Sequence, residues 1–321
     1  MTKKLSVLIG SVLSDKVEYY LALFNEQTSR DFRMVFLSEH EPDTSKFNFE
    51  FMWVKEHGRA FQPNIRRMRH ACYKNELLLA IEADPTPYVL MFDAYQIPTK
   101  RLVEEHIKYL AKGYAVVGSR IETFPVAEEW QVGVPCTVSK SDPRYNGREI
   151  TRIDPGSHWD CNASCAYEDM LKVNGYDMHF MGGGGGEDCD KAIRIARTGR
   201  GFVYNYRALM YHPNHDTMMT NFVMGSQKDR AVRFNAQHYH APYKFRASPW
   251  DPVSSGDDAL MEDECLVCHY DEKGFKYWRC KACGEEGLVD SVHVHQWNEA
   301  HKVVRTDFGM NELREWIHGS Y

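Results

Sequence analysis

The sequence predicts an α/β protein built on a mostly parallel sheet with helices on both faces. Short apolar runs alternate with longer segments whose apolar residues recur at helical spacing. A chain of 321 residues with 43% hydrophobic content is long enough for one large domain and a smaller one. A glycine-rich stretch followed at once by two acidic residues marks an expected ligand-binding loop.

The elements are expected in alternating order along the first part of the chain. Residues 4–12 form a short apolar run that suits a buried first strand, and residues 16–27 have helical spacing. A second strand is expected at 33–37, and a long helix over 63–82, with Pro63 tolerated in its first turn. A third strand at 88–92 ends at Asp93. Parallel sheets bind ligands beyond the carboxyl ends of their strands, so Asp93 should lie at the binding edge.

Five consecutive glycines at 182–186 are the most informative feature. Such a run costs backbone entropy on folding, and it lets the backbone approach a ligand closely because no Cβ intervenes. Glu187 and Asp188 follow at the start of a segment with helical spacing. Acidic residues are common in a helix first turn, where they cap the helix. Next to a glycine run, the same carboxylates also suit a general base beside an open cleft.

The segment GGGGGEDCD (182–190) resembles the acceptor-side motif of GT-A glycosyltransferases, which reads GWGGED in the galactosyltransferases of that family. Glycine stands here in place of the Trp. The resemblance implies a GT-A fold, Rossmann-like and similar to glycosyltransferase family 2. It also implies that Asp188 is the catalytic base, that Glu187 is its acceptor-binding neighbour, and that Gly185 and Gly186 line the acceptor site.

Residues 93–98 (DAYQIP) resemble the DxD motif of the same family, with Tyr95 where the second Asp, the usual metal ligand, should stand. A carboxylate-held Mg²⁺ or Mn²⁺ neutralises a departing nucleotide diphosphate. Asp93 is therefore expected either to contact the ribose or to hold a divalent ion with other help. His212 is a candidate second ligand, and an ordinary loop histidine is the alternative.

Weaker matches occur in the family's order over residues 4–215. Residues 73–75 (YKN) resemble an Arg-Asn pair that faces the donor, and residues 159–176 resemble the strand and helix before the acceptor loop. The resemblance implies a nucleotide-sugar donor, expected to be UDP-linked. The donor-binding candidates are Asp93, Tyr95, Glu39, Lys74, Asn75 and Ser11; the acceptor-binding candidates are Asn162, Asp160, Trp159, Gly185 and Gly186.

Four of the nine cysteines form two Cys-x2-Cys pairs separated by eleven residues. This spacing is typical of a zinc ribbon, in which four thiolates hold a structural Zn²⁺ that replaces a hydrophobic core. Disulfides are the rival interpretation, and the lack of a secretory signal argues against them. The predicted zinc ligands are Cys265, Cys268, Cys280 and Cys283.

Composition divides the rest of the chain. We expect a glycosyltransferase domain at 1–250, an acidic linker at 251–263, the zinc ribbon at 264–292, and a His-rich tail with a terminal helix at 293–321. No apolar stretch is long enough to span a bilayer, and the amino-terminal segment turns polar too early for a signal peptide. A soluble, cytoplasmic protein is expected, in the host cytoplasm if a phage encodes it.

The acceptor is predicted from local charge, because the net charge of −6 gives no general polyanion-binding surface. Residues 228–246 combine five basic with several aromatic side chains, as nucleic-acid contacts require. A solvated helix face is the alternative. With the ribbon, the chain is similar to soluble DNA-base glycosyltransferases of phages, some linked to TET/JBP-type oxygenases.

The sequence therefore predicts an inverting hexosyl- or pentosyltransferase. The favoured acceptor is the hydroxymethyl group of a flipped pyrimidine such as 5-hydroxymethylcytosine in DNA. Two alternatives stay open. In one, the same enzyme glycosylates a saccharide or a protein. In the other, Tyr95 marks a decayed donor site, and the chain is a nucleic-acid-binding protein on an inactive scaffold.

Overall fold

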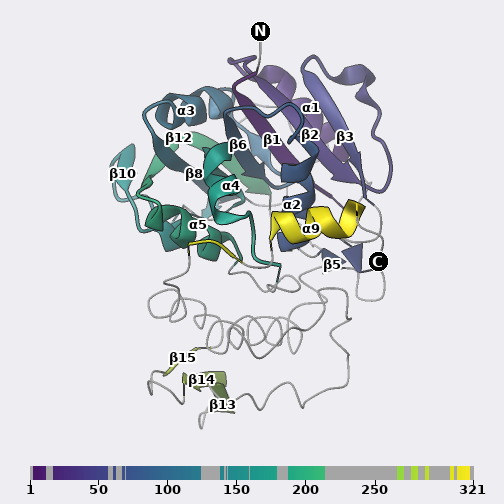
Figure 1. Cartoon of the computed structure of the whole chain (residues 1–321). Coiled ribbons are helices and arrows are strands. Elements are labelled where there is room, and N and C mark those ends of the chain that lie inside the picture. The colour runs from purple at the N-terminus through teal and green to yellow at the C-terminus, as the bar shows by residue number, and fades with distance from the viewer. Residues whose placement is uncertain are drawn as a thin grey trace.

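The computed structural model contains a large α/β unit and a small three-stranded sheet (Figure 1). It describes residues 3–11, 17–56, 61–62, 67–68, 70–123, 138–140, 142, 144–158, 160–178, 187–213, 266–270, 276–280, 286–288, 304–306 and 309–318.

Four neighbouring strands form a parallel half of the large sheet, in the order β6, β1, β2, β3. Their sequences are mostly apolar, as in the run LSVLIG of β1, which is typical of strands covered on both faces. This half confirms the predicted parallel arrangement. The strands are β1 (Leu5–Gly10), β2 (Phe32–Ser38), β3 (Glu50–Lys55) and β6 (Tyr88–Phe92).

The other half of the sheet is mixed, which corrects the prediction of a mostly parallel sheet. Strand β11 (Asn162–Ala166) is antiparallel both to β6 and to β8 (Tyr114–Thr123). Asn162 pairs with Phe92, so the chain enters β11 at the edge where β6 ends, and the two strands must run in opposite directions. Strand β12 (Gly201–Pro213) is parallel to β8. The remaining antiparallel strands are β7 (Ile97–Pro98), β9 (Val138–Lys140) and β10 (Ile150–Arg152).

Helices cover both faces of the sheet, as predicted. Alternate residues of β2 enter different cores: Val35 and Leu37 pack into one, Met34 and Phe36 into the other. Helices α2, α4, α5 and α9 contribute to the first core, and α1 and α3 to the second. None of the described helices is long and apolar enough to cross a membrane. The helices are α1 (Val17–Ala22), α2 (His70–Ala80), α3 (Leu102–Leu110), α4 (Tyr167–Val173), α5 (Glu187–Arg197) and α9 (Met310–His318), with single turns at η1 (Leu23–Glu26), η2 (Thr44–Lys46) and η3 (Pro155–Ser157).

Helix α2 begins at His70, which corrects the predicted start at Pro63. Strands β4 (Phe61–Gln62) and β5 (Arg67–Met68) pair antiparallel ahead of it, and extended residues cannot belong to a helix. Arginines at positions 66, 67 and 69 would also place like charges within one helical turn, which disfavours a helix there.

The helix predicted near the chain end is present as α9, and it packs into the α/β unit. Met310 is 1% exposed and belongs to the first core. Leu313 is fully buried against Cys72 of α2 and Met178. Figure 1 shows α9, in yellow, alongside α2. The segment that follows the predicted ribbon in sequence therefore completes the core of the α/β unit.

The small sheet consists of β13 (Leu266–Tyr270), β14 (Lys276–Cys280) and β15 (Glu286–Leu288), all paired antiparallel. Strand β13 pairs with β14 from Leu266 opposite Cys280 to Tyr270 opposite Lys276. Cys268 lies on β13 and Cys280 on β14. Cys265, Cys283 and the predicted linker lie outside the described residues. The zinc site stays a prediction.

Candidate active site

One edge of the large sheet collects several of the predicted site residues. Parallel strands end at a common edge, and Ser11, Glu39 and Asp93 directly follow β1, β2 and β6 there. Strand β11 runs in the opposite direction, so Asp160, two residues before it, lies at the same edge. The edge thus brings a residue from the predicted acceptor side next to those from the predicted donor side.

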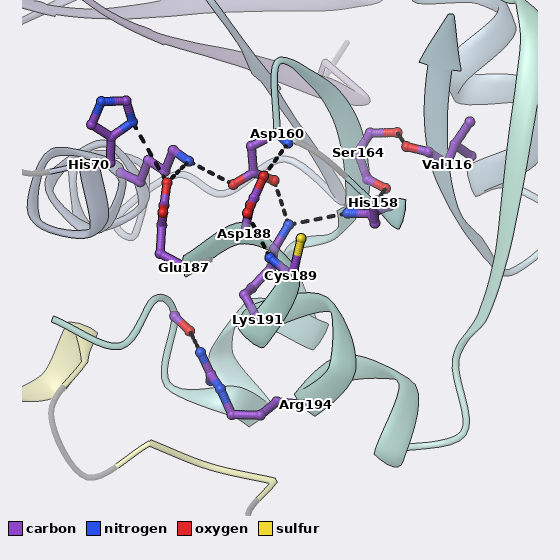
Figure 2. Close-up of polar contacts among 12 residues, drawn as sticks. His70, Val116, His158, Asp160, Ser164, Glu187, Asp188, Cys189, Lys191 and Arg194 are labelled. Carbon is purple, nitrogen blue, oxygen red and sulfur yellow. Dashed lines mark hydrogen bonds and ion pairs between the residues drawn. The ribbon is translucent and has the colours of Figure 1, made fainter. Parts of the chain in front are cut away.

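The first turn of α5 brings two more carboxylates to Asp160 (Figure 2). The Asp160 amide donates to Asp188 Oδ2 at 3.3 Å, and the Cys189 amide donates to Asp188 Oδ1 at 2.8 Å. Lys74 of α2 lies between the other two acids, with its Nζ 3.0 Å from Asp160 Oδ2 and 3.0 Å from Glu187 Oε1. Asp160, Glu187 and Asp188 are called the carboxylate cluster below.

A second lysine and a histidine extend this buried network. Lys191, one turn into α5, lies with its Nζ 2.6 Å from Asp160 Oδ1 and 3.3 Å from His158 Nδ1. His158 Nε2 lies 3.3 Å from the Ser164 carbonyl, to which only an N–H can donate, so Nδ1 is the acceptor that faces the ammonium. Burial, together with the positive charge of Lys191, lowers the pKa of His158 to about 3, and the ring is neutral.

The lysines keep two members of the carboxylate cluster ionised. Burial alone favours the neutral acid, but Lys191 and Lys74 hold the pKa of Asp160 well below its usual range. Burial acts on Glu187 in the same way, and there Lys74 and His70 lower the pKa below its usual value. The His70 ring nitrogen Nδ1 lies 3.7 Å from Glu187 Oε1. Two ammonium groups thus balance two carboxylates.

The pKa of Asp188 is shifted in the opposite direction, upward. Burial, and then the negative charges of Glu187 and Asp160, raise the pKa of Asp188 to about 6. Asp188 is partly exposed while Glu187 is only 6% exposed, so Asp188 is the member that meets solvent. A carboxylate with this pKa is mostly ionised at pH 7 and accepts a proton more readily than an ordinary one. Neighbouring acids with separated pKa values are characteristic of acid–base sites.

The predicted divalent-ion site does not fit the residues that the structure describes. Tyr95 cannot replace the missing carboxylate, which leaves Asp93 and His212 as ligands. His212 Nδ1 lies 3.3 Å from a guanidinium nitrogen of Arg120, and that positive charge disfavours a cation beside it. Among the described residues, no three His, Cys, Asp or Glu side chains are grouped so that they could hold a metal ion. An octahedral Mg²⁺ or Mn²⁺ prefers oxygen ligands, of which these residues supply too few.

The other donor-binding candidates at this edge have differing surroundings. Ser11 is buried, and Glu39 is exposed at the end of β2. Asp93 is partly exposed and accepts a hydrogen bond from Gln96 Nε2 at 2.9 Å. The Tyr95 ring packs against the second core. Asp93 and Glu39 therefore offer the accessible carboxylates of this group.

Two asparagines predicted to contact ligands lie inside the protein instead. Asn162 is fully buried; its Nδ2 donates to the Ala208 carbonyl at 2.8 Å, and its Oδ1 lies 2.8 Å from His106 Nε2. Asn75 is also fully buried, and its amide group bonds both the carbonyl and the amide of Tyr176 at 2.8 Å. These asparagines use their polar atoms to join sheet strands and to hold a turn, so they have no surface to offer a sugar.

Lys74 and Asp160 are likewise internal, at 5% and 4% exposed, and each is paired with the other. Their placement gives Lys74 a role in setting the charge of the carboxylate cluster, where the sequence suggested a donor contact. Trp159, Gly185 and Gly186 lie outside the described residues.

Sequence reasoning missed four cations or imidazoles of this edge: His70, Arg120, His158 and Lys191. Lys191 carried a usable signal, because it lies four positions after Glu187 and so on the same face of the predicted helix. His158 lies two positions before Asp160 and directly before the segment 159–176 that was matched to the strand and helix ahead of the acceptor loop. His70 and Arg120 carried no comparable signal.

The sequence matches no protein-family model and no curated protein. Among solved structures, it is similar to S. aureus TarS 1–349 in complex with UDP, with a TM-score of 0.46 and 11% identity over 74% of this chain and 72% of that one. It is similar to the mannosyltransferase PcManGT of Pyrobaculum calidifontis, in complex with GDP-Man and Mn²⁺ (TM-score 0.48, 16% identity, 78% and 67% covered). It is also similar to GalNAc-T7 with UDP, GalNAc and Mn²⁺ (TM-score 0.49, 13% identity, 78% and 53% covered). With TM-scores below 0.5, these similarities leave the function to be argued from the site itself.

Proposed function

We propose that the protein is an inverting glycosyltransferase of the GT-A type that moves a sugar from a nucleotide-sugar to a hydroxyl acceptor. The observation that carries the proposal is the carboxylate cluster, in which Asp188 has a pKa of about 6 beside two ionised acids. Glu187 and Asp188 of this cluster open α5 directly after the glycine run, and glycine lets a substrate approach the backbone closely. The DAYQIP segment lies at the same sheet edge as Asp160.

In the proposed reaction, Asp188 removes the proton from the acceptor hydroxyl. The hydroxyl oxygen then bonds the anomeric carbon as the bond from that carbon to the diphosphate oxygen breaks on the opposite face. The negative charge that leaves with the diphosphate needs a positive partner. Arg120 supplies a guanidinium at this edge. Lys74 and Lys191 keep Asp160 and Glu187 charged, and those charges keep Asp188 basic.

The pH dependence tests this electrostatic arrangement. Below pH 6 the raised pKa leaves Asp188 protonated and unable to accept a proton, so kcat/KM should rise with pH and level off above about 6. Glu187→Gln removes a negative charge that raises the pKa of Asp188, so the rise should move to lower pH. The measurement is the pH profile of sugar transfer for the wild type and the variant. Glu168→Gln, which neutralises an exposed carboxylate on α4, is the control. A Glu187→Gln profile that is unchanged or shifted upward would contradict the assignment.

We propose DNA that contains a hydroxymethylpyrimidine as the acceptor. Support comes from the sequence: the basic and aromatic residues at 228–246 and the two Cys-x2-Cys pairs, of which Cys268 and Cys280 lie on paired strands. An extruded base would present its hydroxymethyl group to Asp188. Transfer to oligosaccharide or to protein without DNA would favour the saccharide- or protein-directed alternative. Binding to DNA without sugar transfer would favour the inactive scaffold.

The zinc ribbon gives a separate test. Four thiolates at the predicted spacing should hold one Zn²⁺, so elemental analysis of the purified protein should find one zinc per chain. Cys280→Ser should lose the metal and raise the KM for the DNA acceptor more than it lowers kcat. Cys136→Ser, outside the two pairs, should keep the metal. A zinc-free wild type would contradict the site, and an unchanged KM in Cys280→Ser would mean that the ribbon does not hold the acceptor.

A further inference from the structure

The last part of the chain returns to the α/β unit at the turn that leads toward the glycine run. The chain leaves the large sheet at the end of β12, and residues 304–306 and 309–318 again contact α2 and α4. The Thr306 amide donates to the Val173 carbonyl at 3.2 Å, and the Met310 amide donates to the Asn174 carbonyl at 3.0 Å. Residues 304–318 are called the C-terminal strap. The segment with the predicted ribbon is therefore joined to the α/β unit at both of its ends.

The side chain of Asn174 makes the hydrogen bonds that join the strap to this turn. Asn174 ends α4 in the left-handed conformation, with φ of 63° and a buried side chain. Its Nδ2 donates to the Thr306 carbonyl at 3.0 Å and to Glu312 Oε2 at 2.8 Å. Its Oδ1 accepts from the Asn311 amide at 2.9 Å. One side chain thus bonds three separate positions of the strap.

The contact leaves no room for larger residues. A Cβ on Gly309 would lie 1.8 Å from the Asn174 carbonyl oxygen. A Cβ on Gly175, where φ is 69°, would lie 2.4 Å from Met310 Cγ and 2.4 Å from Asn75 Oδ1. The backbones of the strap and of the turn therefore lie too close together for a side chain between them, and Gly175 and Gly309 permit this close approach.

The same turn is bonded on its other side to the elements that carry the site. Asn75, next to Lys74 on α2, holds both backbone groups of Tyr176. Arg194 of α5 donates to the Val173 carbonyl at 2.6 Å and to the Gly175 carbonyl at 2.9 Å. The Tyr176 ring lies under both lysines of the network, 5.0 Å from the Lys74 ammonium and 5.4 Å from that of Lys191. The turn at 174–176 thus contacts the strap on one side and, through the Tyr176 ring, Lys74 and Lys191 on the other. These lysines keep Asp160 and Glu187 ionised.

We infer that the C-terminal strap positions the active site, with Asn174 and Glu312 as positioning residues that act through the 174–176 turn on Lys74, Lys191 and the start of α5. The inference rests on the proposed function for its kinetic readout only. The strap then has a role beyond core packing. When its hydrogen bonds to Asn174 are lost, Lys74 and Lys191 move and kcat falls, although the protein is still folded.

The test compares variants of the full chain. Glu312→Ala removes an acceptor shared by the Asn174 side chain and the Gly309 amide. Asn174→Gly keeps the left-handed backbone accessible and removes the three bonds to the strap. Glu312→Gln keeps an acceptor oxygen, and Glu315→Ala alters an exposed position of the same helix; both serve as controls.

For Glu312→Ala and Asn174→Gly, kcat should fall at least about tenfold with a donor KM within about twofold of the wild type, at a temperature where circular dichroism shows every variant folded. The fall in kcat of the double variant should be smaller than the product of the two single falls, because both variants remove the Asn174–Glu312 bond. The two controls should keep wild-type kcat. Folded variants with wild-type kcat would overturn the inference, since a strap that only stabilises the fold does not alter turnover.

Hydrogen exchange separates this inference from the proposed function. In Glu312→Ala, backbone amides of residues 174–178 and 187–190 should exchange faster than in the wild type, while those of β1 and β2 should not change. This readout needs no substrate and no fully active enzyme. Unchanged exchange at 187–190 would overturn the positioning role even if sugar transfer were absent from every protein tested.

Discussion

Asp188→Asn should lower kcat for sugar transfer by about 10²–10⁴-fold, the usual contribution of a general base, and leave the Kd for the nucleotide-sugar nearly unchanged. The amide keeps an oxygen that can accept the 2.8 Å bond from the Cys189 N–H, and it gives up only the longer 3.3 Å bond from the Asp160 amide. It cannot take the acceptor proton at neutral pH. The measurement is kcat at saturating donor and acceptor, with donor affinity from calorimetry.

The stability of the same variant gives an independent check on the electrostatics. Asp188 lies near two other carboxylates that raise its pKa, so removing its charge relieves repulsion. The thermal midpoint at pH 7 should therefore be equal to or above that of the wild type. Glu315→Gln, an exposed carboxylate change on α9, is the matched control and should retain full activity. Wild-type turnover in Asp188→Asn would remove Asp188 from the mechanism.

Lys74→Met should destabilise the fold by about 3–5 kcal/mol at pH 7, the usual cost of stranding a partner of a buried ion pair. Lys74 is 5% exposed, and its ammonium contacts both Asp160 and Glu187. Without it, the partly exposed His70 is the cationic neighbour that remains to Glu187 among the described residues. The free energy of unfolding, from urea titration, measures the loss.

The effect of Lys74→Met should also depend on pH. Lys74 lowers the pKa of Glu187 and Asp160, so the stability it contributes is present above their ordinary pKa values and is lost as pH falls through the lowered ones. The difference between variant and wild type should therefore shrink toward pH 3. Lys172→Met is the matched control, because Lys172 pairs with Glu168 at the surface and should contribute no more than about 1 kcal/mol. Equal losses in the two variants would contradict the buried network.

The sequence predicted the α/β class, the strand at Tyr88–Phe92 and a helix near the chain end, which is found at Met310–His318, because each shows its apolar periodicity locally. The direction of β11 is not a local property. It depends on which edge the chain enters, so the mixed half of the sheet was not predictable from the run at 162–166. The start of α2 was missed because the pairing of β4 with β5 overrides helical spacing.

The site residues also differ in whether their placement depends on neighbours in sequence or on tertiary contacts. Glu187 and Asp188 were placed in a helix first turn from adjacent residues, and α5 confirms that placement. Lys74 was selected as a residue that faces the donor, yet its partners lie 86 and 113 positions away in sequence. Such contacts decide whether a polar side chain faces a ligand or the interior. Asn75 and Asn162 show the same limit, since their bonds join segments that only the tertiary fold brings together.

The most direct test of the central claim is a mass-spectrometric transfer assay. Wild-type protein and Asp188→Asn would be incubated with a mixture of nucleotide-sugars and with hydroxymethylated or unmodified DNA, each with Mn²⁺ and with a chelator. We expect a hexose- or pentose-sized mass gain on the modified nucleoside with the wild type and none with the variant. Nucleotide-sugar hydrolysis by the wild type alone would retain the catalytic claim and exclude this acceptor. If neither protein consumed any nucleotide-sugar, or if both consumed it equally, the claim that Asp188 catalyses sugar transfer would be contradicted.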